Sequence, residues 1–499
     1  MKKILSLILL CTSAYALQAQ FDAFHYNDDL SLTADSTARQ MSKAMKILSE
    51  FRLQLYTQTE WQRADTSGKN SSGPLGIDGV GSFQGGTFPA AANNRFLQRR
   101  TRFKLSFEHR NSKDLKILEF AFQLEAYNYN NGLAAPSSLV KEAYGRLIDP
   151  WIGWFSFQGG IFNRPFGYET PSNPAFAESP EFARVNQTML PNEAELGAGI
   201  IIESPSKFEK VYLRLDAFAV NGVGVGVGAQ SGAYTGRKDF IGRIKVGKMW
   251  NVGSATKVGF NATASYYNGG VLQTTNNVYV LEKNTAGNMV YTNIGSPSGN
   301  FSNPGGKLTT FTREYYGGHL EFKADYPLGI TTLRGEFMAG VQPGTQNSSL
   351  APTGLELNYF PAAADLYIRR FAGGSALLTQ SFKQRAGKHL IMHDITLKYD
   401  VYNPQTLLTG PQLNNTVNSY AITDIKYTTI GFGYSIVPYN WFKLMVWYDW
   451  VINENTNVPG YYTDFKKDNV LTIRAQFYLD SWWFNPKSKY KDNLMLKKY

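Results

Sequence analysis

The residues whose types and spacing could do chemistry are few: five histidines, one glycine-rich run and a single cysteine. His389 and His393 lie in the sequence HLIMH, which on a helix would place both imidazoles on one face as a metal-binding pair. On a strand the same residues stand about 13 Å apart, too far to share one ion. We favour the strand, so no metal site is predicted.

The glycine-rich run GVGVGVGA places Gly224, Gly226 and Ala229 at the spacing of a dinucleotide-binding fingerprint. No helix pattern follows it, and the chain continues as QSGAYTG, so we predict a loop. No G-x-S-x-G elbow is present. A hydrolase remains an alternative, because Ser and His can meet across strands without a local motif; its sign would be a lumen-facing or rim-facing Ser near His109 or His319. The favoured prediction is no enzyme activity and no cofactor.

The cysteine, Cys11, lies in a segment that resembles an export signal. Lys2 and Lys3 precede an apolar run, and small residues lead to Ala19, so residues 1–19 are predicted to be a cleaved signal peptide. Acylation of Cys11 is an alternative, but the preceding residue is a leucine and not a small residue. The exported chain would hold no thiol, which excludes disulfides, zinc–thiolate sites and cysteine nucleophiles.

Composition favours a β-rich membrane protein. The 499 residues include 30 Tyr, 32 Phe, 9 Trp and 46 Gly, which suits strands whose amphipathic rings lie at membrane interfaces. The formal net charge is +11, of which the signal segment supplies two. Export argues against nucleic acid as a partner, so we interpret the positive net charge as attracting anions into a pore.

The elements that must position any site are strands with period-two alternation. Leu118, Phe120, Phe122 and Leu124 alternate with Glu119, Ala121, Gln123 and Glu125, and similar segments recur along the chain, the last including Leu471, Ile473, Ala475, Phe477 and Leu479. Apolar-out and polar-in alternation over about ten residues is typical of a tilted membrane strand.

The connections also alternate. Short ones are Asn111 to Asp114, Asp149-Pro150, Ser204 to Glu209, Tyr326 to Gly329 and Val437 to Asn440; long ones are roughly 62–95, 128–138, 164–195, 221–237, 268–311, 342–365, 403–423 and 453–467. Strict alternation requires an additional strand at about 367–382. The prediction is an all-β fold, a 16-stranded antiparallel transmembrane β-barrel with short periplasmic turns and long extracellular loops. It spans 48–479, between a periplasmic segment at 20–47 and a periplasmic tail at 480–499.

One stretch, GGIFNRPFGYETPSNPAF, sends a strand directly into a proline-rich segment. Together with LVKEAY at 139–144, LKYDVYNP at 397–404, TTIGFGYSIVPYNWFKLMVWYDW at 428–450 and the terminal VLTIRAQFYL, it resembles the phosphate-selective porin O and P family over roughly 95–480. The resemblance implies a sixteen-stranded barrel, usually trimeric, whose third loop folds inward and constricts the pore. Prolines suit such a loop, because they cannot donate to a ladder and they restrict its backbone.

Charges of the expected constriction differ from those of a strong anion filter. The loop from Asn163 to Glu195 has a net charge of −3, and its candidate selectivity residues are Arg164, Pro165, Glu169, Glu178, Glu181, Arg184, Glu193 and Glu195. The lumen wall is expected to be basic through Arg100, Arg102, Lys104, Arg214, Arg243 and Lys245. Acidic rings favour cations and basic rings favour anions, so we expect a transverse field between acidic loop and basic wall.

These observations predict an outer-membrane porin of a Gram-negative bacterium. It would be a homotrimer embedded in outer-membrane lipid, passing small hydrophilic solutes or ions by diffusion, with anions such as phosphate implied by the resemblance. The alternative is a poorly conducting structural or secretion-associated barrel whose loops bind partners, which an occluded lumen would favour.

Overall fold

The fold is that of a computed structural model, which describes residues 50–65, 93–112, 115–128, 139–191, 193–204, 211–222, 238–272, 277–295, 310–345, 349, 365–386, 389–412, 424–455 and 469–481. The chain divides into two units, 1–51 and 52–499, and all the strands lie in the second unit except for Phe51, the first residue of the first strand. The predicted signal peptide, the segment 20–47 and most of the tail lie outside the described residues. No helix in the described part has the length and hydropathy of a membrane span.

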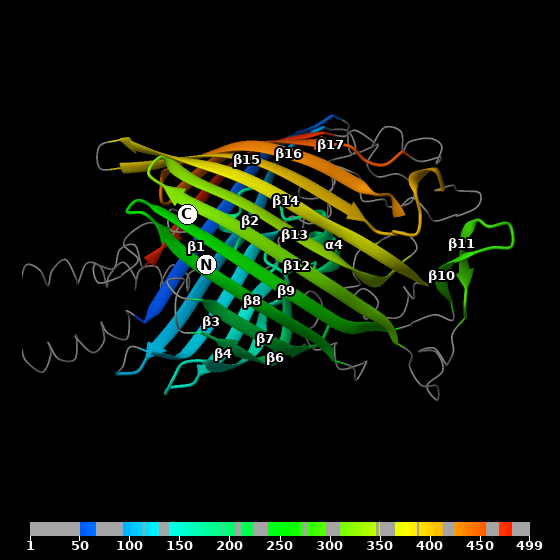
Figure 1. The fold of residues 1–499 in the computed structure, drawn as a ribbon, viewed down its shortest axis with the longest axis horizontal. Coiled ribbons are helices and arrows are strands. Elements are labelled where there is room, and N and C mark those ends of the chain that lie inside the picture. Colours follow the sequence, from blue (N-terminus) through cyan, green and yellow to red (C-terminus); the bar gives the residue numbers. More distant parts are fainter. Residues whose placement is uncertain are drawn as a thin grey trace, which may run out of the picture. The chain divides into compact units, whose positions relative to one another are not determined.

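Sixteen antiparallel strands form one closed ring, and Figure 1 shows many of these strands from the side as long oblique arrows. Their bounds are β1 Phe51–Ala64, β2 Asn94–Arg110, β3 Lys116–Asn128, β4 Leu139–Ile148, β5 Phe155–Asn163, β6 Ala194–Glu203, β7 Tyr212–Val220, β8 Asp239–Val252, β9 Thr256–Leu272, β12 Thr310–Tyr326, β13 Gly329–Gly344, β14 Leu366–Ala386, β15 His389–Asn403, β16 Tyr427–Tyr439, β17 Phe442–Val451 and β18 Val470–Asp480. The first and last strands close the ring by pairing from Gln54 with Asp480 to Ala64 with Val470. Closure leaves no unpaired edge, as hydrocarbon requires.

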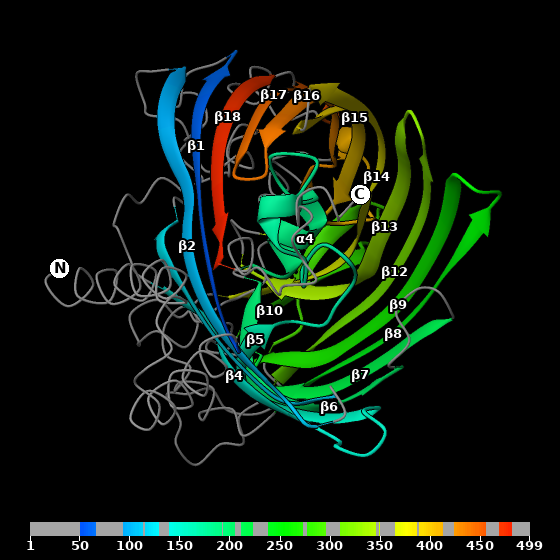
Figure 2. The same cartoon turned by 90° about the vertical axis from the view of Figure 1, so that its left-hand side faces the viewer.

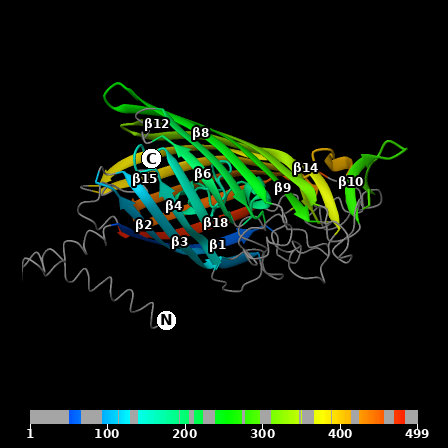
Figure 3. The ribbon, with the colours of Figure 1, turned by 90° about the horizontal axis from the view of Figure 1, so that it is seen from below.

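The structure confirms the predicted strand count and the alternation of connections. The strand required at about 367–382 is β14, and the longest connections fall where they were predicted. The neighbouring strands run obliquely side by side, as Figure 3 shows for the sequence from β2 to β9. One feature was not predicted: the long connection after β9 contains a hairpin, β10 Val278–Lys283 and β11 Met289–Asn293, whose first strand pairs in parallel with the start of β14.

Side chains alternate between the two faces of the ring as period two predicts. On β12, Leu320 is 59% exposed and Phe322 is 44% exposed, whereas the adjacent His319 on the same strand is buried. On β18, Thr472, Arg474 and Gln476 are buried while Phe477 and Leu479 are exposed. Apolar residues therefore face outward, as in a barrel that spans a bilayer, and polar residues face the lumen.

Strand β2 departs from this alternation. Arg95 and Arg99 are buried, and so are Arg100 and Arg102, so the inward face changes phase between residues 99 and 100. The pairing with β3 shifts register nearby, between Thr101 and Arg102, where Ala126 of β3 is left without a partner. Because the adjacent Arg99 and Arg100 are both buried, this strand directs three arginines inward, where regular alternation from Arg100 and Arg102 would turn Arg99 outward.

The pair His389 and His393 lies on β15, as the favoured alternative predicted. His393 bonds to Tyr434 and Gln384 through its two ring nitrogens. Among the described residues, no group of three or more His, Cys, Asp or Glu side chains could hold a metal ion.

We expect Leu320→Arg to lower the free energy of unfolding by about 2–4 kcal/mol, because it places a charge on the lipid-facing side within β12. The same substitution at Leu328, in the turn between β12 and β13, should cost no more than about 1 kcal/mol, because the turn lies at the interface. Urea unfolding in lipid vesicles measures both. Equal costs for the two variants would contradict the assignment of the outer face.

Candidate functional site

The candidate site is the loop that leaves β5 at Asn163 and returns to the barrel at β6, and it lies inside the ring of strands (Figure 2). Ladder pairing persists for one residue, since the amide of Arg164 donates to the carbonyl of Glu193 over 2.9 Å. Pro165 then offers no N–H, and the chain leaves the sheet. The loop contains a 3₁₀ turn, Pro174–Phe176, and one short helix, α4 Arg184–Met189.

Its first anchor is the sequence RPFGYE. The Glu336 carboxylate on β13 accepts hydrogen bonds from the amides of Tyr168 and Glu169, each over 3.1 Å. Gly167 has φ 61°, and a Cβ there would overlap the Glu336 carboxylate. Only glycine adopts this conformation freely and leaves this space, so Gly167 explains why the loop can grip the wall at this point.

The second anchor is aromatic and lies on β12 and β13. Phe166 is fully buried against the backbone of Gly317, where a Cβ would come within 2.7 Å of its ring. Tyr168 stacks on His319 at 4.5 Å between ring centroids, and the Arg334 guanidinium lies 4.2 Å from the centre of its ring. These contacts combine apolar burial with a cation–π interaction.

The third anchor is Glu181, which lies among three arginines. Arg99 donates to both carboxylate oxygens, over 2.6 and 2.9 Å, and Arg100 lies at 2.8 Å. Arg474 of β18 approaches to 3.2 Å. The Glu181 side chain is almost fully buried, so these charge-assisted bonds replace the water that the carboxylate gave up.

Electrostatics at Glu181 reflect two opposed effects. Burial alone would raise the pKa of this loop carboxyl, but the guanidinium groups of Arg100 and Arg99 outweigh burial and hold the pKa well below its usual range. Because the folded-state pKa is lowered, the ion pairs contribute stability above the unfolded pKa and lose it only as the pH falls through the folded value. The cluster should therefore persist in mildly acidic surroundings.

These anchors lie on opposite sides of the ring. Strands β2 and β12 are eight positions apart among sixteen, and the loop contacts Arg99 on β2 and His319 on β12. Between them the 3₁₀ turn is fixed by Gln476 of β18, which donates to the carbonyl of Ala175 over 2.8 Å. The loop therefore crosses the lumen and is bonded at both sides.

The remaining candidate loop residues are also paired. Glu193 contacts Arg102 at 3.1 Å and adopts φ 59°, a conformation unusual for a residue other than glycine. The other pairs are Glu178 with Arg334 at 2.9 Å, Arg164 with Glu195 at 3.3 Å, Glu169 with Asn186 at 2.8 Å, and Arg184 over the Tyr427 ring at 3.2 Å. Each of the five loop carboxylates thus has a partner.

The predicted basic wall divides into two groups. Arg100 and Arg102 contact loop carboxylates, whereas Lys104 pairs with Glu142 on β4. On the other side, Arg214 and Arg243 share Asp216 at 2.8 and 2.7 Å, and Lys245 lies over the Tyr212 ring at 5.8 Å. Two of the six wall residues, Arg100 and Arg102, therefore meet the acidic loop in direct ion pairs, and the transverse field stays a prediction for the other four.

Several residues that hold the loop were not among the candidates. They are Arg99, Gln476, Arg474, Arg334, Glu336, and two lysines that donate to loop carbonyls: Lys398 to Glu181 and Lys443 to Ala177, each over 2.9 Å. Most of them occupy inward positions of a regular strand, which alternation could have indicated. Which inward positions reach the loop depends on pairing across the barrel, which no local pattern contains.

The hydrolase alternative required a serine near His109 or His319. His319 is 2% exposed, and neither of its ring nitrogens has a hydrogen-bond partner among the described residues. Its nearest aromatic contact is the Tyr168 ring, so it packs as an apolar surface under the loop. Among the described residues, no serine hydroxyl is therefore hydrogen-bonded to His319, and the structure shows no Ser–His pair at that position.

No family model matches the sequence, and no curated protein matches it. Solved structures do. The high-pH structure of OprB from Pseudomonas putida aligns with a TM-score of 0.50 at 11% identity, covering 88% of this chain and 97% of that one. The anion-selective porin of Comamonas acidovorans and the outer-membrane channel DcaP of Acinetobacter baumannii align with TM-scores of 0.42 and 0.43 at 10% and 11% identity; each covers 86% of this chain, and they are covered over 99% and 97% of their own lengths.

At this identity the likeness to OprB concerns the fold alone. Together with the closed ring and its outward apolar face, it defines the class: the protein is a sixteen-stranded β-barrel of the Gram-negative outer membrane, with porin-type architecture. The narrower identity as a phosphate-selective porin O and P protein is not supported by a family match.

We expect Glu181→Gln to release the loop, because it leaves the buried guanidinium groups of Arg99 and Arg100 without their carboxylate. Breaking a buried ion pair from one side costs about 3–5 kcal/mol. Amide exchange measured by mass spectrometry should accelerate in residues 177–190. Glu178→Gln is the matched control with a smaller effect, since its partner Arg334 keeps Glu321 at 2.6 Å; equal exchange in both variants would contradict the role given to Glu181.

Proposed function

We propose that the barrel is a porin that passes small hydrophilic solutes or ions by passive diffusion. The observation that carries the proposal is the loop from Asn163 to Glu195, which is bonded to strands on opposite sides of a polar lumen. A loop held in this way narrows the lumen to a fixed width without closing it. The proposal requires no catalysis and no cofactor.

Ion preference follows from charge. The formal net charge of +11, less the two charges of the predicted signal peptide, attracts anions toward the pore, and we place anions such as phosphate among the solutes. Because four of the five loop carboxylates, all except Glu169, are paired with arginines, the lumen has little unbalanced charge at the loop. A weak anion preference is therefore expected, and we propose a homotrimer as the assembly.

The test is a planar bilayer reconstituted with the purified protein under a KCl gradient. Stable conductance steps in groups of three, with a reversal potential on the anion side and block by added phosphate, would support the full proposal. Steps without phosphate block would support a general porin. A cation-side reversal potential would contradict the anion preference.

A second candidate is a poorly conducting barrel whose loops bind partners. The observation in its favour is the number of sides on which the loop touches the wall, including β2, β12, β13, β15, β17 and β18. Absence of conductance from correctly folded, heat-stable protein would favour this candidate and exclude the porin.

Gly167→Ala should raise the single-channel conductance, because the added Cβ overlaps the Glu336 carboxylate and forces the loop from its anchor. The matched control is Gly335→Ala, at the residue that directly precedes Glu336 on β13, where a Cβ would meet only the Ser375 carbonyl at 3.9 Å. Single-channel recording compares the two with the wild type. If Gly167→Ala conducts like the control, the loop does not limit the current.

A further inference from the structure

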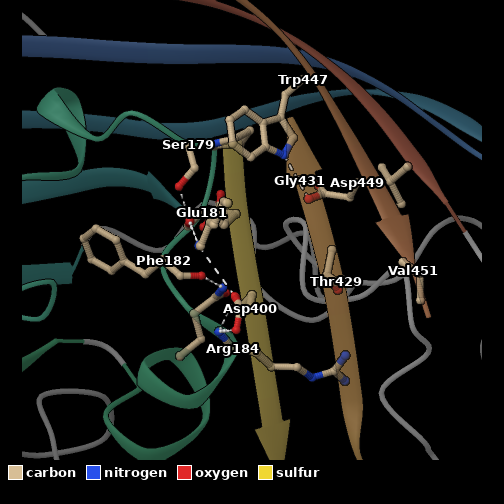
Figure 4. Close-up of a pocket in the computed structure, with 14 residues that line it drawn as sticks. Ser179, Glu181, Phe182, Arg184, Asp400, Thr429, Gly431, Trp447, Asp449 and Val451 are labelled. Carbon is tan, nitrogen blue, oxygen red and sulfur yellow. Dashed lines mark hydrogen bonds and ion pairs between the residues drawn. The ribbon is translucent and has the colours of Figure 1, made fainter. Parts of the chain in front are cut away.

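We propose that the barrel holds a small monovalent cation, of ammonium or potassium size, at Asp449. The site lies in a pocket between the loop and the wall (Figure 4). It is bordered by loop residues 179–182, 184 and 187 and by side chains of β15, β16, β17 and the start of β18. The inference does not depend on conduction, because it concerns a fixed site in the folded barrel.

Asp449 has one satisfied and one unsatisfied oxygen. Its Oδ1 accepts a hydrogen bond from Trp447 Nε1 over 2.9 Å, whereas its Oδ2 is buried without a hydrogen-bond partner among the described residues. The residue as a whole is 4% exposed. A buried carboxylate oxygen without a donor or counter-ion is costly, so Oδ2 requires a cation, a hydrogen-bond donor or a bound proton, and the first of these is the proposal tested below.

The basic groups of the pocket are committed elsewhere. Lys398 donates to the Glu181 carbonyl over 2.9 Å and lies 3.5 Å from Asp400. The Asp400 carboxylate accepts the amide of Arg184 over 3.0 Å, as Figure 4 shows. Of the three carboxylates in the lining, Glu181 is paired with arginines and Asp400 lies 3.5 Å from Lys398, whereas Asp449 forms no ion pair among the described residues, so a cation is favoured over an anion at Asp449.

Size and ligand number narrow the choice. The cavity measures about 30 Å³, whereas one water needs roughly 10–15 Å³ of the same measure, so the space suits an ion of ammonium or potassium size with a water beside it. A divalent ion requires several oxygen ligands, and the described residues contain no cluster of three or more acidic or imidazole groups arranged for one. A monovalent ion carries half the charge, so its desolvation beside a single carboxylate costs less than that of a divalent ion.

Gly431 on β16 leaves the space in which Trp447 and Asp449 adopt this arrangement. A Cβ there would overlap the indole of Trp447 and lie 3.0 Å from Asp449 Oδ1. The glycine lets the indole lie flat on the neighbouring strand and hold Oδ1, which leaves Oδ2 directed away from that bond. The orientation of the carboxylate therefore follows from two residues on adjacent strands.

The test uses the full-length protein in detergent, and it measures the thermal unfolding midpoint in ammonium chloride and in tetraethylammonium chloride at equal ionic strength. Ammonium should raise the midpoint of the wild type relative to the larger cation, because a ligand that binds only the folded state stabilises it. Asp449→Asn should abolish this difference. Asp394→Asn, which removes a lumen carboxylate that already accepts from Ser381 over 2.6 Å, should retain it.

A second measurement needs no variant. Crystals of the wild type soaked in rubidium chloride should show an anomalous peak at coordinating distance from Asp449 Oδ2. A wild-type midpoint that does not distinguish the two cations, or rubidium peaks only elsewhere, would overturn the cation site. A silent bilayer with a retained ammonium effect would instead count against the proposed porin function alone.

Discussion

Every backbone N–H and C=O that enters the hydrocarbon of a membrane must find its partner within the protein, and the rest of this structure depends on that constraint. It requires the first and last strands to meet, as β1 and β18 do over eleven paired positions. Closure fixes an inside and an outside, and the strand pleat then assigns successive residues to lipid and to lumen. The lumen consequently receives many charged side chains that must themselves be paired.

The loop after β5 provides partners for that polar interior. Glu181 neutralises arginines from β2 and β18 that would otherwise repel one another in a confined space. Glu336 on β13 plays the reverse part, because a wall carboxylate accepts the amides of the loop backbone. A loop carboxylate therefore binds wall arginines, and a wall carboxylate binds loop amides. As a result, the loop crosses the lumen with bonds to the wall at both ends.

Two glycines allow close contacts that involve carboxylates of this interior. Gly167 lets the loop backbone reach Glu336, and Gly431 lets Trp447 lie flat and direct Asp449. In both places a missing Cβ allows a carboxylate to approach a group that it would otherwise be held away from. At Asp449 the result is a carboxylate with one bonded oxygen and one oxygen that has no hydrogen-bond partner among the described residues.

The sequence alone determined the ring. Period-two alternation, the spacing of turns and the parity of short and long connections predict sixteen strands, including β14, because each of these signals is local and repeats along the chain. It also predicted that the segment from Asn163 leaves the sheet, since Pro165 cannot donate to a ladder. Arginines at regular inward positions, such as Arg102 and Arg214, were likewise predictable from the pleat.

Only the tertiary structure decided which charges meet. The phase change in β2 turns Arg99 inward, and the partners of Glu181 come from strands separated by more than 300 residues in the chain. The hairpin β10–β11 and the unpaired oxygen of Asp449 depend in the same way on neighbours across the barrel. Such pairings are set by register and shear around a closed ring, which no window of sequence contains.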